Sequence, residues 1–276
     1  GSIMALATKD VLTIPPTSTI KSAIEVMMEN RFRRLPVADP GTDRLLGMLG
    51  SSAIEDLIGG GGNYQFISKG HRGNFLSAIN DSVRRIMNRE VLTLDKRSSA
   101  KDAIHAILSS KRGGVVVVDR DRIVQGIVTE RDLLKPAMEA SAGKEVSELM
   151  TERVISATPG TSVGDAAKIM IRNSFRRIPI VSEDRLVGLV TTRTLVNFIG
   201  RNGAFHRLRK NDMEEVLNTR VSDVMSHTTA SVERDAPLRA AIDLMLSTGE
   251  GTVCVVEGDQ LAGILTERDV VKTLAA

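Results

Sequence analysis

The sequence is poor in aromatic residues, with no tryptophan, one tyrosine and six phenylalanines among its 276 positions. A core must therefore be built from aliphatic side chains and methionine. Few rings are left on which the bases of single-stranded nucleic acid could stack. The hydrophobic share of 42% and the charged share of 26% are nevertheless typical of a globular protein, and the length suits about two domains.

Cysteine and long apolar stretches are also scarce. Cys254 is the only cysteine, which excludes an intramolecular disulfide, and its place in the apolar run 252–256 predicts a buried core position. No apolar stretch approaches the roughly 18 residues that a membrane-spanning helix needs. The first residues lack the apolar segment of a signal peptide. We therefore expect a soluble, cytoplasmic protein without a membrane partner.

Charge of one sign is not in large excess, because 37 Lys and Arg residues face 34 Asp and Glu residues and leave a net charge of +3. Such a balance does not indicate a polyanionic partner. The densest basic run, HRLRK at residues 206–210, is typical of solvated surface, although it could meet a phosphate tail or an acidic partner. The four histidines show neither an HExxH motif nor a spacing with cysteine, so no metal site is predicted.

Four segments of the chain are similar to one another, at residues 11–59, 91–136, 154–200 and 228–274. Each begins with a short apolar strand pattern, continues into an amphipathic helix, and ends with two strands rich in β-branched residues and a closing helix. In the first segment the helix is marked by Ile20, Ala23, Ile24, Met27 and Met28. In the second segment the two strands are expected at 115–118 and 123–128. The predicted fold class is α/β (α+β), with the order β-α-β-β-α repeated four times.

A unit of about 50 to 60 residues has difficulty burying enough surface alone, so we expect the repeats to share cores in pairs. The first and third repeats share the motifs FRRLPV and FRRIPI, whereas the second and fourth share GIVTERDLLK and GILTERDVVK. A module of two repeats was therefore duplicated whole. The expected limits are residues 3–60, 80–137, 145–200 and 219–276 for the repeats, 3–137 and 145–276 for the modules, and 61–79 and 201–218 for the linkers.

These motifs resemble those of the cystathionine-β-synthase (CBS) domain family, in which an apolar strand ends in Gly-x-x-Thr-x-x-Asp at the start of a helix. The four-repeat layout resembles stand-alone archaeal four-domain proteins related to the γ regulatory subunit of AMP-activated protein kinase. The resemblance covers essentially the whole chain. It implies that two domains pair through their sheets into a Bateman module, that two modules form a flat disc, and that nucleotides bind in clefts between paired domains.

The TERD motifs, Thr129 to Asp132 and Thr266 to Asp269, allow two interpretations. In the structural one, the threonine and the aspartate form a capping box that satisfies free backbone N–H groups. In the functional one, the threonine and the helix N-terminus face a phosphate while the aspartate accepts hydrogen bonds from a ribose diol. The spacing of the two residues keeps the carboxylate away from the phosphate.

The arginine pairs, Arg33 with Arg34 and Arg176 with Arg177, also allow two interpretations. They could be solvated charges at a strand edge. Guanidinium groups also bind phosphate oxygens through charge-assisted hydrogen bonds, so each pair could be a phosphate clamp. The arginine pair occurs only in the odd repeats and the Thr/Asp pair only in the even ones. Shared descent could preserve this alternation without any ligand.

In the family, one cleft takes its aspartate from one domain and its basic residues largely from the paired domain. Carried over to this chain, the resemblance implies one furnished cleft per module, with Ile127 and Pro36, or Ile264 and Pro179, as walls for the adenine, although these four residues could also be plain strand packing. The implied ligand-binding residues are Asp132, Thr129, Arg33, Arg34, Ile127 and Pro36 in the first module, and Asp269, Thr266, Arg176, Arg177, Ile264 and Pro179 in the second.

The remaining cleft of each module has lost these residue types. Gly50 and Ala53 in the first repeat, and Thr191 and Thr194 in the third, stand where the motif has Thr and Asp. Glycines 113 and 114, and residues 251–252, stand where the arginine pair would be. We expect these two clefts to be empty or weak.

The sequence favours a non-catalytic sensor that binds AMP, ADP or ATP as regulatory ligands and signals by a conformational change or to an unidentified regulated protein. The four repeats leave no room for a catalytic domain, and we find no P-loop, nucleophile elbow or metal triad, so we expect neither an enzyme nor a catalytic cofactor. Two alternatives stay open: a sensor of an adenosyl ligand such as S-adenosylmethionine, and a nucleic-acid-binding module that uses the basic clusters. The chain could be a monomer or a homodimer.

Overall fold

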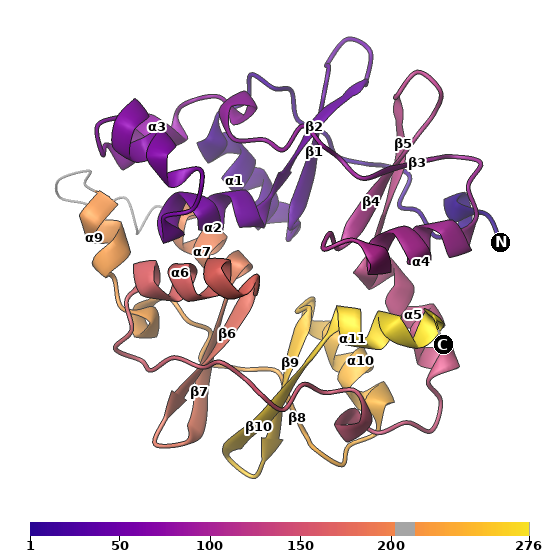
Figure 1. Ribbon diagram of the computed structural model, residues 1–276, viewed down its shortest axis with the longest axis vertical. Coiled ribbons are helices and arrows are strands. Elements are labelled where there is room, and N and C mark those ends of the chain that lie inside the picture. Colours follow the sequence, from indigo (N-terminus) through magenta and orange to yellow (C-terminus); the bar gives the residue numbers. More distant parts are fainter. Residues whose placement is uncertain (202–212, 276) are drawn as a thin grey trace.

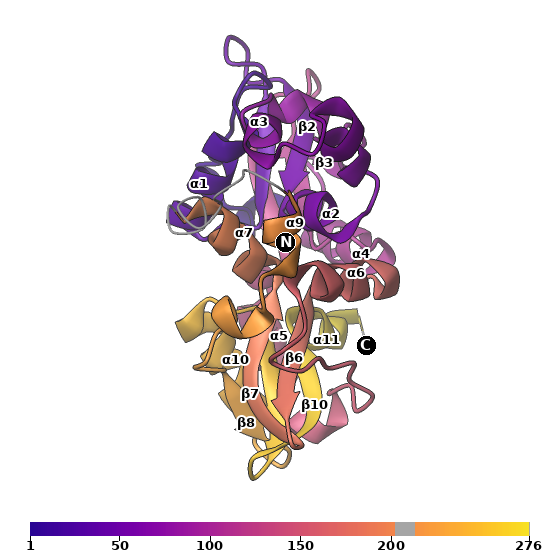
Figure 2. The same cartoon turned by 90° about the vertical axis from the view of Figure 1, so that its left-hand side faces the viewer.

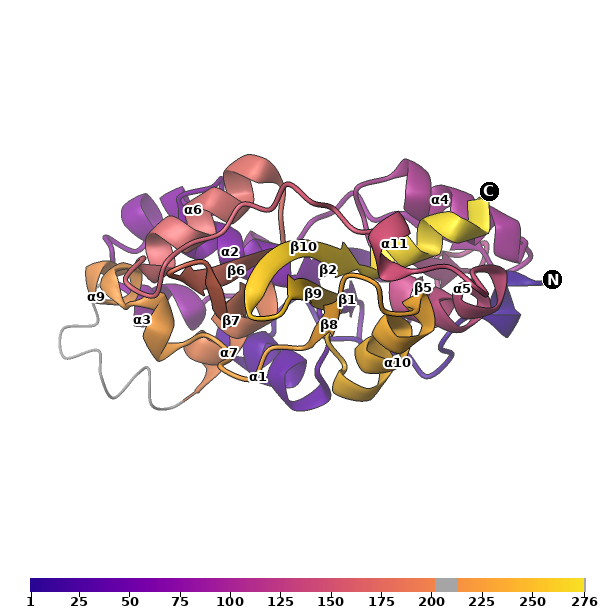
Figure 3. The same ribbon diagram turned by 90° about the horizontal axis from the view of Figure 1, so that it is seen from below.

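The computed structural model describes residues 1–201 and 213–275, and Figure 1 shows four similar units placed around a common centre. The two views from the side show that this arrangement is flattened (Figures 2 and 3). The expected α/β class and the disc of four repeats are confirmed. The basic run 206–210 lies outside the described residues.

The odd repeats each contain two helices and a two-stranded antiparallel ribbon. In both repeats the expected first strand is reduced to a single parallel bridge, Ile14 with Val37 and Ala157 with Ile180. The elements of the first repeat are α1 (Ile20–Asn30), β1 (Arg34–Ala38), β2 (Leu45–Gly50) and α2 (Ser51–Gly59), and those of the third are α6 (Val163–Asn173), β6 (Arg177–Ser182), β7 (Arg185–Thr191) and α7 (Thr192–Gly200).

The even repeats have a true first strand, which pairs in parallel with the next one. The strands expected at 115–118 and 123–128 are confirmed to within one residue. The elements of the second repeat are β3 (Thr93–Asp95), α4 (Ala100–Ser109), β4 (Gly114–Val118), β5 (Val124–Thr129), η4 (Glu130–Leu133) and α5 (Leu134–Ala140), and those of the fourth are β8 (Ser231–Glu233), α10 (Leu238–Thr248), β9 (Thr252–Glu257), β10 (Gln260–Thr266), α11 (Glu267–Val271) and η7 (Lys272–Ala275).

A short leader segment precedes each repeat and packs on the other repeat of its module. Thr8 pairs with Ile127, and Asn88 pairs with Met48, so the first two repeats exchange leaders. The second module does the same through Thr151 with Ile264 and Ser226 with Leu189. The short helices of the leaders and connections are η1 (Ile3–Ala5), η2 (Phe66–Gly70), α3 (Phe75–Ile79), η3 (Val83–Arg85), η5 (Val146–Glu148), α9 (Met213–Asn218) and η6 (Val221–Asp223).

Within each module the two repeats meet through their sheets, as expected. In the second module the strands form one five-stranded sheet of order β6-β7-β10-β9-β8, joined where Gln260 pairs with Arg185. In the first module a two-stranded and a three-stranded sheet meet at a single bridge between Arg44 and Ile123. The clefts of each module therefore lie beside this sheet junction.

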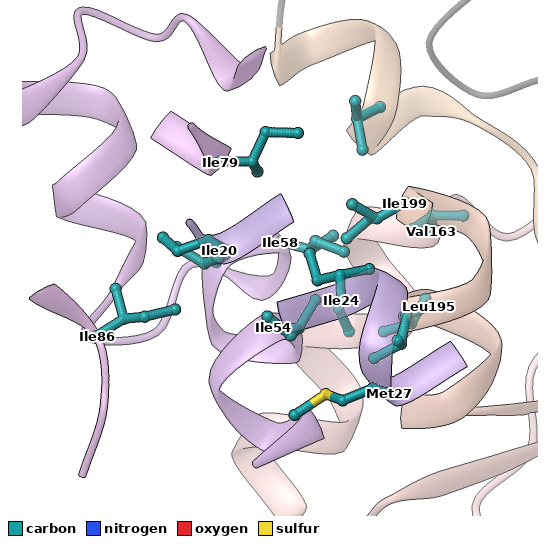
Figure 4. Packing of buried hydrophobic residues seen from close by; sticks show 14 of the residues in the cluster. Ile20, Ile24, Met27, Ile54, Ile58, Ile79, Ile86, Val163, Leu195 and Ile199 are labelled. Carbon is teal, nitrogen blue, oxygen red and sulfur yellow. The ribbon is translucent and has the colours of Figure 1, made fainter. Parts of the chain in front are cut away.

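The two modules meet through helices. Helices α1 and α2 of the first repeat pack on α6 and α7 of the third, and Figure 4 shows Ile24, Ile58, Leu195 and Ile199 gathered in their common core. The helices approach closely: a Cβ atom at Gly59 would overlap Cδ1 of Ile171. In the even repeats, Leu134 and Ala137 of α5 belong to the core of the fourth repeat.

The core is aliphatic, as the composition predicts. Phe75 is the one aromatic side chain among the buried hydrophobic residues of the described part of the chain. Cys254 is fully buried, and burial raises the pKa of its thiol to about 12, which confirms the predicted core cysteine. Over the ranges 1–201 and 213–275, the helices lack the length and apolar character that crossing a membrane requires.

Candidate functional site

A cavity of about 210 Å³ between the first two repeats is lined by all six residues predicted for the first module. We call it the Asp132 cleft. Thr129 and Asp132 lie at the start of η4, Ile127 lies on β5, and the arginine pair and Pro36 lie at the beginning of β1. Residues about 100 positions apart in sequence thus meet because β4 and β5 sit beside β1 and β2 at the module's sheet junction.

The capping box is present in both TERD motifs. The backbone N–H and the Oγ1 hydroxyl of Thr129 donate to Oδ2 of Asp132, over 2.8 and 3.1 Å. Thr266 makes the same bonds to Asp269, over 2.9 and 3.0 Å. Oδ1 of Asp132 accepts no hydrogen bond from the described residues, so the cap leaves this oxygen for a ligand, whereas Oδ1 of Asp269 lies 4.0 Å from Nζ of Lys272 in an ion pair. The structural and the functional interpretations are therefore compatible.

The Asp132 carboxyl group is partly withdrawn from water. Burial raises its pKa above the ordinary value, and the hydrogen bonds from Thr129 oppose this shift without cancelling it. A ligand that donates hydrogen bonds to Oδ1 would favour the ionised form. The free oxygen of Asp132 is therefore suited to a neutral donor such as a sugar diol.

Each arginine pair contains one tethered and one free guanidinium group. Nη2 of Arg33 donates to Oε2 of Glu267 over 2.6 Å, and Nη2 of Arg176 donates to the carbonyl of Lys111 over 3.3 Å. The guanidinium groups of Arg34 and Arg177 have no hydrogen bond or ion pair with any of the residues that the structure describes. The second arginine of each pair is therefore the one available to a phosphate.

The free arginines are crowded by other positive charges. Burial, together with Arg33 and Arg176, lowers the pKa of Arg34 to about 9. Burial, Arg176 and Arg33 lower the pKa of Arg177 to about 10. Both shifts have the same origin, because charged side chains are held together at the centre of the disc without enough anions. An anionic ligand would relieve this repulsion.

Two buried glutamates at the centre were not identified from the sequence. Glu267, of which only 1% of the side chain is exposed, joins Arg33 to Arg131, with Nη2 of Arg131 2.8 Å from its Oε1. Burial opposes ionisation of Glu267, but the two arginines outweigh it and lower its pKa. Glu130 accepts from Nε of Arg268 over 2.9 Å. The sequence did contain a sign of these glutamates, because both TERD motifs carry the same Glu-Arg pair. Such a pair at the start of a helix is usually solvated, so it did not indicate burial.

Further residues complete the Asp132 cleft. Leu12 and Phe32 are large apolar side chains, each 43% exposed, and both line the cavity. Arg193 reaches it from the third repeat and donates to the carbonyls of Arg31 and Gly249. The cleft thus includes a residue of the second module. A clue in the sequence was the placement of two of the six phenylalanines directly before the arginine pairs.

The second module brings together part of its predicted set. Arg176, Arg177 and Thr266 line one wall of a cleft that continues into the first module. The negative charge of Asp269 acts on Arg177, which places the two groups near one another. Ile264 on β10 and Pro179 on β6 are buried strand residues that do not line this cleft.

The other cleft of each module is an open cavity. In the second module, a cavity of about 890 Å³ is lined by Thr191 and Thr194, which form a neutral capping box. We call this the Thr191 cleft. The cavity that Arg176, Arg177 and Thr266 line has a volume of about 730 Å³, and its lining in the first module includes Gly50, Ala53 and Gly113. We call this the Gly113 cleft. Unlike the sequence-based expectation, arginines do reach it, because Arg34 and Arg176 also line it.

No group of three or more His, Cys, Asp and Glu side chains in residues 1–201 and 213–275 is placed to hold a metal ion. The candidate chemistry is therefore that of carboxylate, hydroxyl and guanidinium groups around recessed clefts. Such a site can hold a sugar and an anionic group at the same time.

The fold and clefts agree with the comparisons to known proteins. The model of the CBS domain matches residues 3–59, 83–139, 146–201 and 221–276, and the chain belongs to the CBS domain family. It is 35% identical to the uncharacterised protein MJ1225 of Methanocaldococcus jannaschii over 269 residues, which are 97% of this chain and 96% of that one. It is 27% identical over 261 residues to a 33.4 kDa protein in the ribosomal RNA operon of Thermofilum pendens, covering 95% and 87% of the two chains.

Solved structures show the same architecture. The crystal structure of MJ1225, described as a proposed archaeal homologue of γ-AMPK, has a TM-score of 0.93 at 34% identity and covers 99% of this chain and 100% of that one. A Pyrococcus horikoshii protein has a TM-score of 0.62 at 19% identity, with 99% and 100% of the chains covered, and is similar in fold alone.

Proposed function

We propose that this protein is a non-catalytic sensor that binds adenine nucleotides, AMP, ADP or ATP, in the Asp132 cleft and at the corresponding position beside Asp269 in the second module. The observation that carries the proposal is the convergence of Asp132, Thr129 and the unpaired Arg34 on one cavity with apolar walls. The relationship of MJ1225 to γ-AMPK, as its structure is described, supports the same ligand class.

In the proposed complex each part of the nucleotide meets a matching group. The ribose diol donates to Oδ1 of Asp132, which the capping box leaves free. The phosphates meet Arg34, whose charge lacks a partner. The adenine lies against the exposed apolar surface of Leu12 and Phe32, with Ile127 beside them. Asp269 and Arg177 take the corresponding roles in the second module.

The electrostatics of the centre separate this ligand class from the alternatives. A sulfonium ligand such as S-adenosylmethionine would add a positive charge beside Arg33, Arg34 and Arg176, which already repel one another. A nucleic acid would have to place its phosphates in a recessed cavity of about 210 Å³. A mononucleotide brings the negative charge that these arginines lack and is not held in a polymer outside the cleft.

The signal would come from the contacts that join the modules. Arg33 of the first repeat is tethered to Glu267 of the fourth and also lines the Asp132 cleft. A phosphate in the cleft competes with Glu267 for this guanidinium group. Occupancy therefore changes the contact between modules, with a coupling free energy of about 1 to 3 kcal/mol, and a regulated partner protein would read the altered surface.

The test is isothermal titration calorimetry of the full chain with AMP, ADP, ATP and S-adenosylmethionine. We expect Asp132→Asn to weaken one class of AMP sites by roughly 10- to 100-fold, because it removes charged hydrogen-bond acceptors worth about 1.5 to 3 kcal/mol. Asp269→Asn should weaken the other class. Asp165→Asn is the matched control, since its carboxylate is 66% exposed on α6 and lies outside the cavities described above.

Unchanged AMP and ATP binding in the double variant Asp132→Asn/Asp269→Asn would overturn the site assignment. Binding of S-adenosylmethionine more tightly than of AMP would overturn the ligand class. Nucleotide hydrolysis that is lost in the same double variant would contradict the non-catalytic role.

A further inference from the structure

The Gly113 cleft keeps the apolar wall of a ligand site but has no motif carboxylate. Met48, Val91 and Leu92 line it from the first and second repeats. Gly50 and Ala53 occupy the positions of the motif threonine and aspartate. A ligand in this cleft would therefore lie beside an apolar surface without the motif aspartate that accepts hydrogen bonds from a ribose diol.

Arginines enter this cleft through the space that two glycines leave. A Cβ atom at Gly113 would overlap Nη2 of Arg34 and lie 3.0 Å from Nη1 of Arg176. A Cβ atom at Gly114 would lie 3.5 Å from Nε of Arg34. The glycines at these positions are therefore not a lost phosphate clamp. They make room for the arginines of the first and third repeats.

The helix that begins at this cleft is the one closing helix without a capping box. The other three closing segments start with Thr129, Thr191 and Thr266, each paired with the side chain three residues later. Helix α2 begins after Gly50, with no side-chain cap and no acidic residue in its first turn. The N–H group of Ser51 donates to the backbone carbonyl of Arg33 over 2.8 Å, but no side chain caps the N–H groups that follow and no acidic residue of the first turn offsets the helix dipole.

The acidic side chains of the cleft are already occupied or neutral. Glu130 is paired with Arg268, and Asp56 accepts a hydrogen bond from the backbone of Asn63 over 3.3 Å. Burial and the nearby Asp56 raise the pKa of Glu55 to about 8, so it is mostly protonated at neutral pH. Apart from Arg268, which is paired with Glu130, the basic side chains that line the cleft are Arg34, Lys111, Arg112, Arg176 and Arg177.

We propose that the Gly113 cleft is an anion site that binds a phosphate or pyrophosphate group without recognising a ribose, so that its ligand is a small phosphoanion. The helix α2 N-terminus and Arg34 hold the anion from two sides, and Arg176 adds charge from the second module. The two clefts share Arg34 and differ in what they require of the ligand, because this site needs the anion and not the sugar.

Ala53 allows a test confined to this cleft, because among the cavities described here it lines this one alone. The variant Ala53→Asp places a carboxylate in the first turn of α2, beside the N–H groups of the site, and Ala53→Asn adds the same bulk without the charge. An aspartate in the first turn of a helix is favourable, so we expect Ala53→Asp to fold. Thermal unfolding of both variants checks this.

The experiment is a calorimetric titration of the full chain with inorganic pyrophosphate in the presence of saturating adenosine, which carries no phosphate. We expect Ala53→Asp to weaken pyrophosphate binding at least 10-fold and Ala53→Asn to change it less than threefold. Gly113→Ala should also weaken binding, because it displaces Arg34, whereas Gly160→Ala, where a Cβ atom meets nothing within 4 Å, should not.

Equal pyrophosphate affinity in Ala53→Asp and Ala53→Asn would overturn the proposal, and so would a wild-type chain that binds no pyrophosphate. ATP could also bind in this cleft by its phosphates alone. The double variant Asp132→Asn/Asp269→Asn would then keep some ATP binding, and adding Ala53→Asp to it would reduce that binding. Adenosine binding would not change. Failure of adenosine to bind the wild-type chain would instead count against the proposed nucleotide sensor and leave the pyrophosphate result intact.

Discussion

Substitution of Glu267 tests how much the buried ion pairs at the centre of the disc stabilise the protein. Its side chain is buried and lies between Arg33 and Arg131, over 2.6 and 2.8 Å. Glu130 is its counterpart in the second repeat and has one arginine partner, Arg268. The substitutions Glu267→Gln and Glu130→Gln keep the shape of the side chain and remove its charge, so the pair forms an internal comparison.

The two substitutions should differ in their cost. Removing one partner of a buried ion pair costs about 3 to 5 kcal/mol. We expect about 3 kcal/mol for Glu267→Gln, at the lower end, because Arg33 is 18% and Arg131 is 32% exposed and the amide oxygen still accepts one hydrogen bond. We expect about 1 kcal/mol for Glu130→Gln, because Arg268 also donates to three backbone carbonyls.

Stability and ligand affinity should move in opposite directions in Glu267→Gln. The loss of the carboxylate releases Arg33, which lines the Asp132 cleft, so we expect AMP to bind more tightly while the chain unfolds at a lower temperature. Because the chain has no tryptophan, unfolding is followed by circular dichroism and differential scanning calorimetry. AMP affinity is measured by titration calorimetry.

Two results would refute this reasoning. Equal losses of stability in Glu267→Gln and Glu130→Gln would show that the second arginine contact contributes nothing. An AMP affinity that falls in Glu267→Gln would show that the glutamate supports the ligand site and does not compete with the phosphate for Arg33.

Three further predictions concern pH and packing. AMP binding to the Asp132 cleft should weaken as the pH falls from neutral through the raised pKa of Asp132, because the diol needs the ionised carboxylate, and also as the pH rises through the lowered pKa of Arg34, about 9; titrations at several pH values check this, and Asp132→Asn should lose the acidic dependence alone. The folded state keeps Glu55 protonated up to about pH 8, whereas the unfolded chain ionises it near 4.5, so stability should fall across this range by up to about 1.4 kcal/mol per pH unit, and Glu55→Gln should remove the slope in denaturant titrations. Gly59→Ala should destabilise the interface of the first and third repeats by about 1 to 3 kcal/mol, because its Cβ atom would meet the backbone of Ala167 at 3.0 Å, while Gly160→Ala should leave the unfolding midpoint unchanged within about 0.5 kcal/mol.

The repeat pattern was enough to predict the architecture. The apolar spacing from Ile20 to Met27 predicted helix α1, and the motifs GIVTERDLLK and GILTERDVVK predicted strands that end at a helix start. These signals depend on residues that are close together in the chain, so they can be recognised from the sequence alone. The alternation of the FRR and TERD motifs between odd and even repeats indicated which repeats form a pair.

The sequence could not show how the arginines divide their roles. Arg33 is tethered by Glu267, which lies 234 positions away, and no local pattern indicates that contact. Gly113 was interpreted as the loss of an arginine, because a glycine in the sequence does not show which neighbouring side chain occupies the space beside it. It is a neighbouring repeat that fills this space. Contacts of this kind depend on the packing of the modules, which a single sequence does not contain.

The exchanged leader segments have a consequence for how such a protein can arise and be divided. Ile3 is buried in the core of the second repeat, and Thr8 pairs with Ile127 in the wall of the Asp132 cleft. The unit that repeats along the sequence is thus not the unit that closes in space. A gene fragment that encodes one repeat would lack a segment of its own fold and carry one that belongs to its neighbour. Duplication or excision therefore preserves a folded unit only when it moves repeats in pairs.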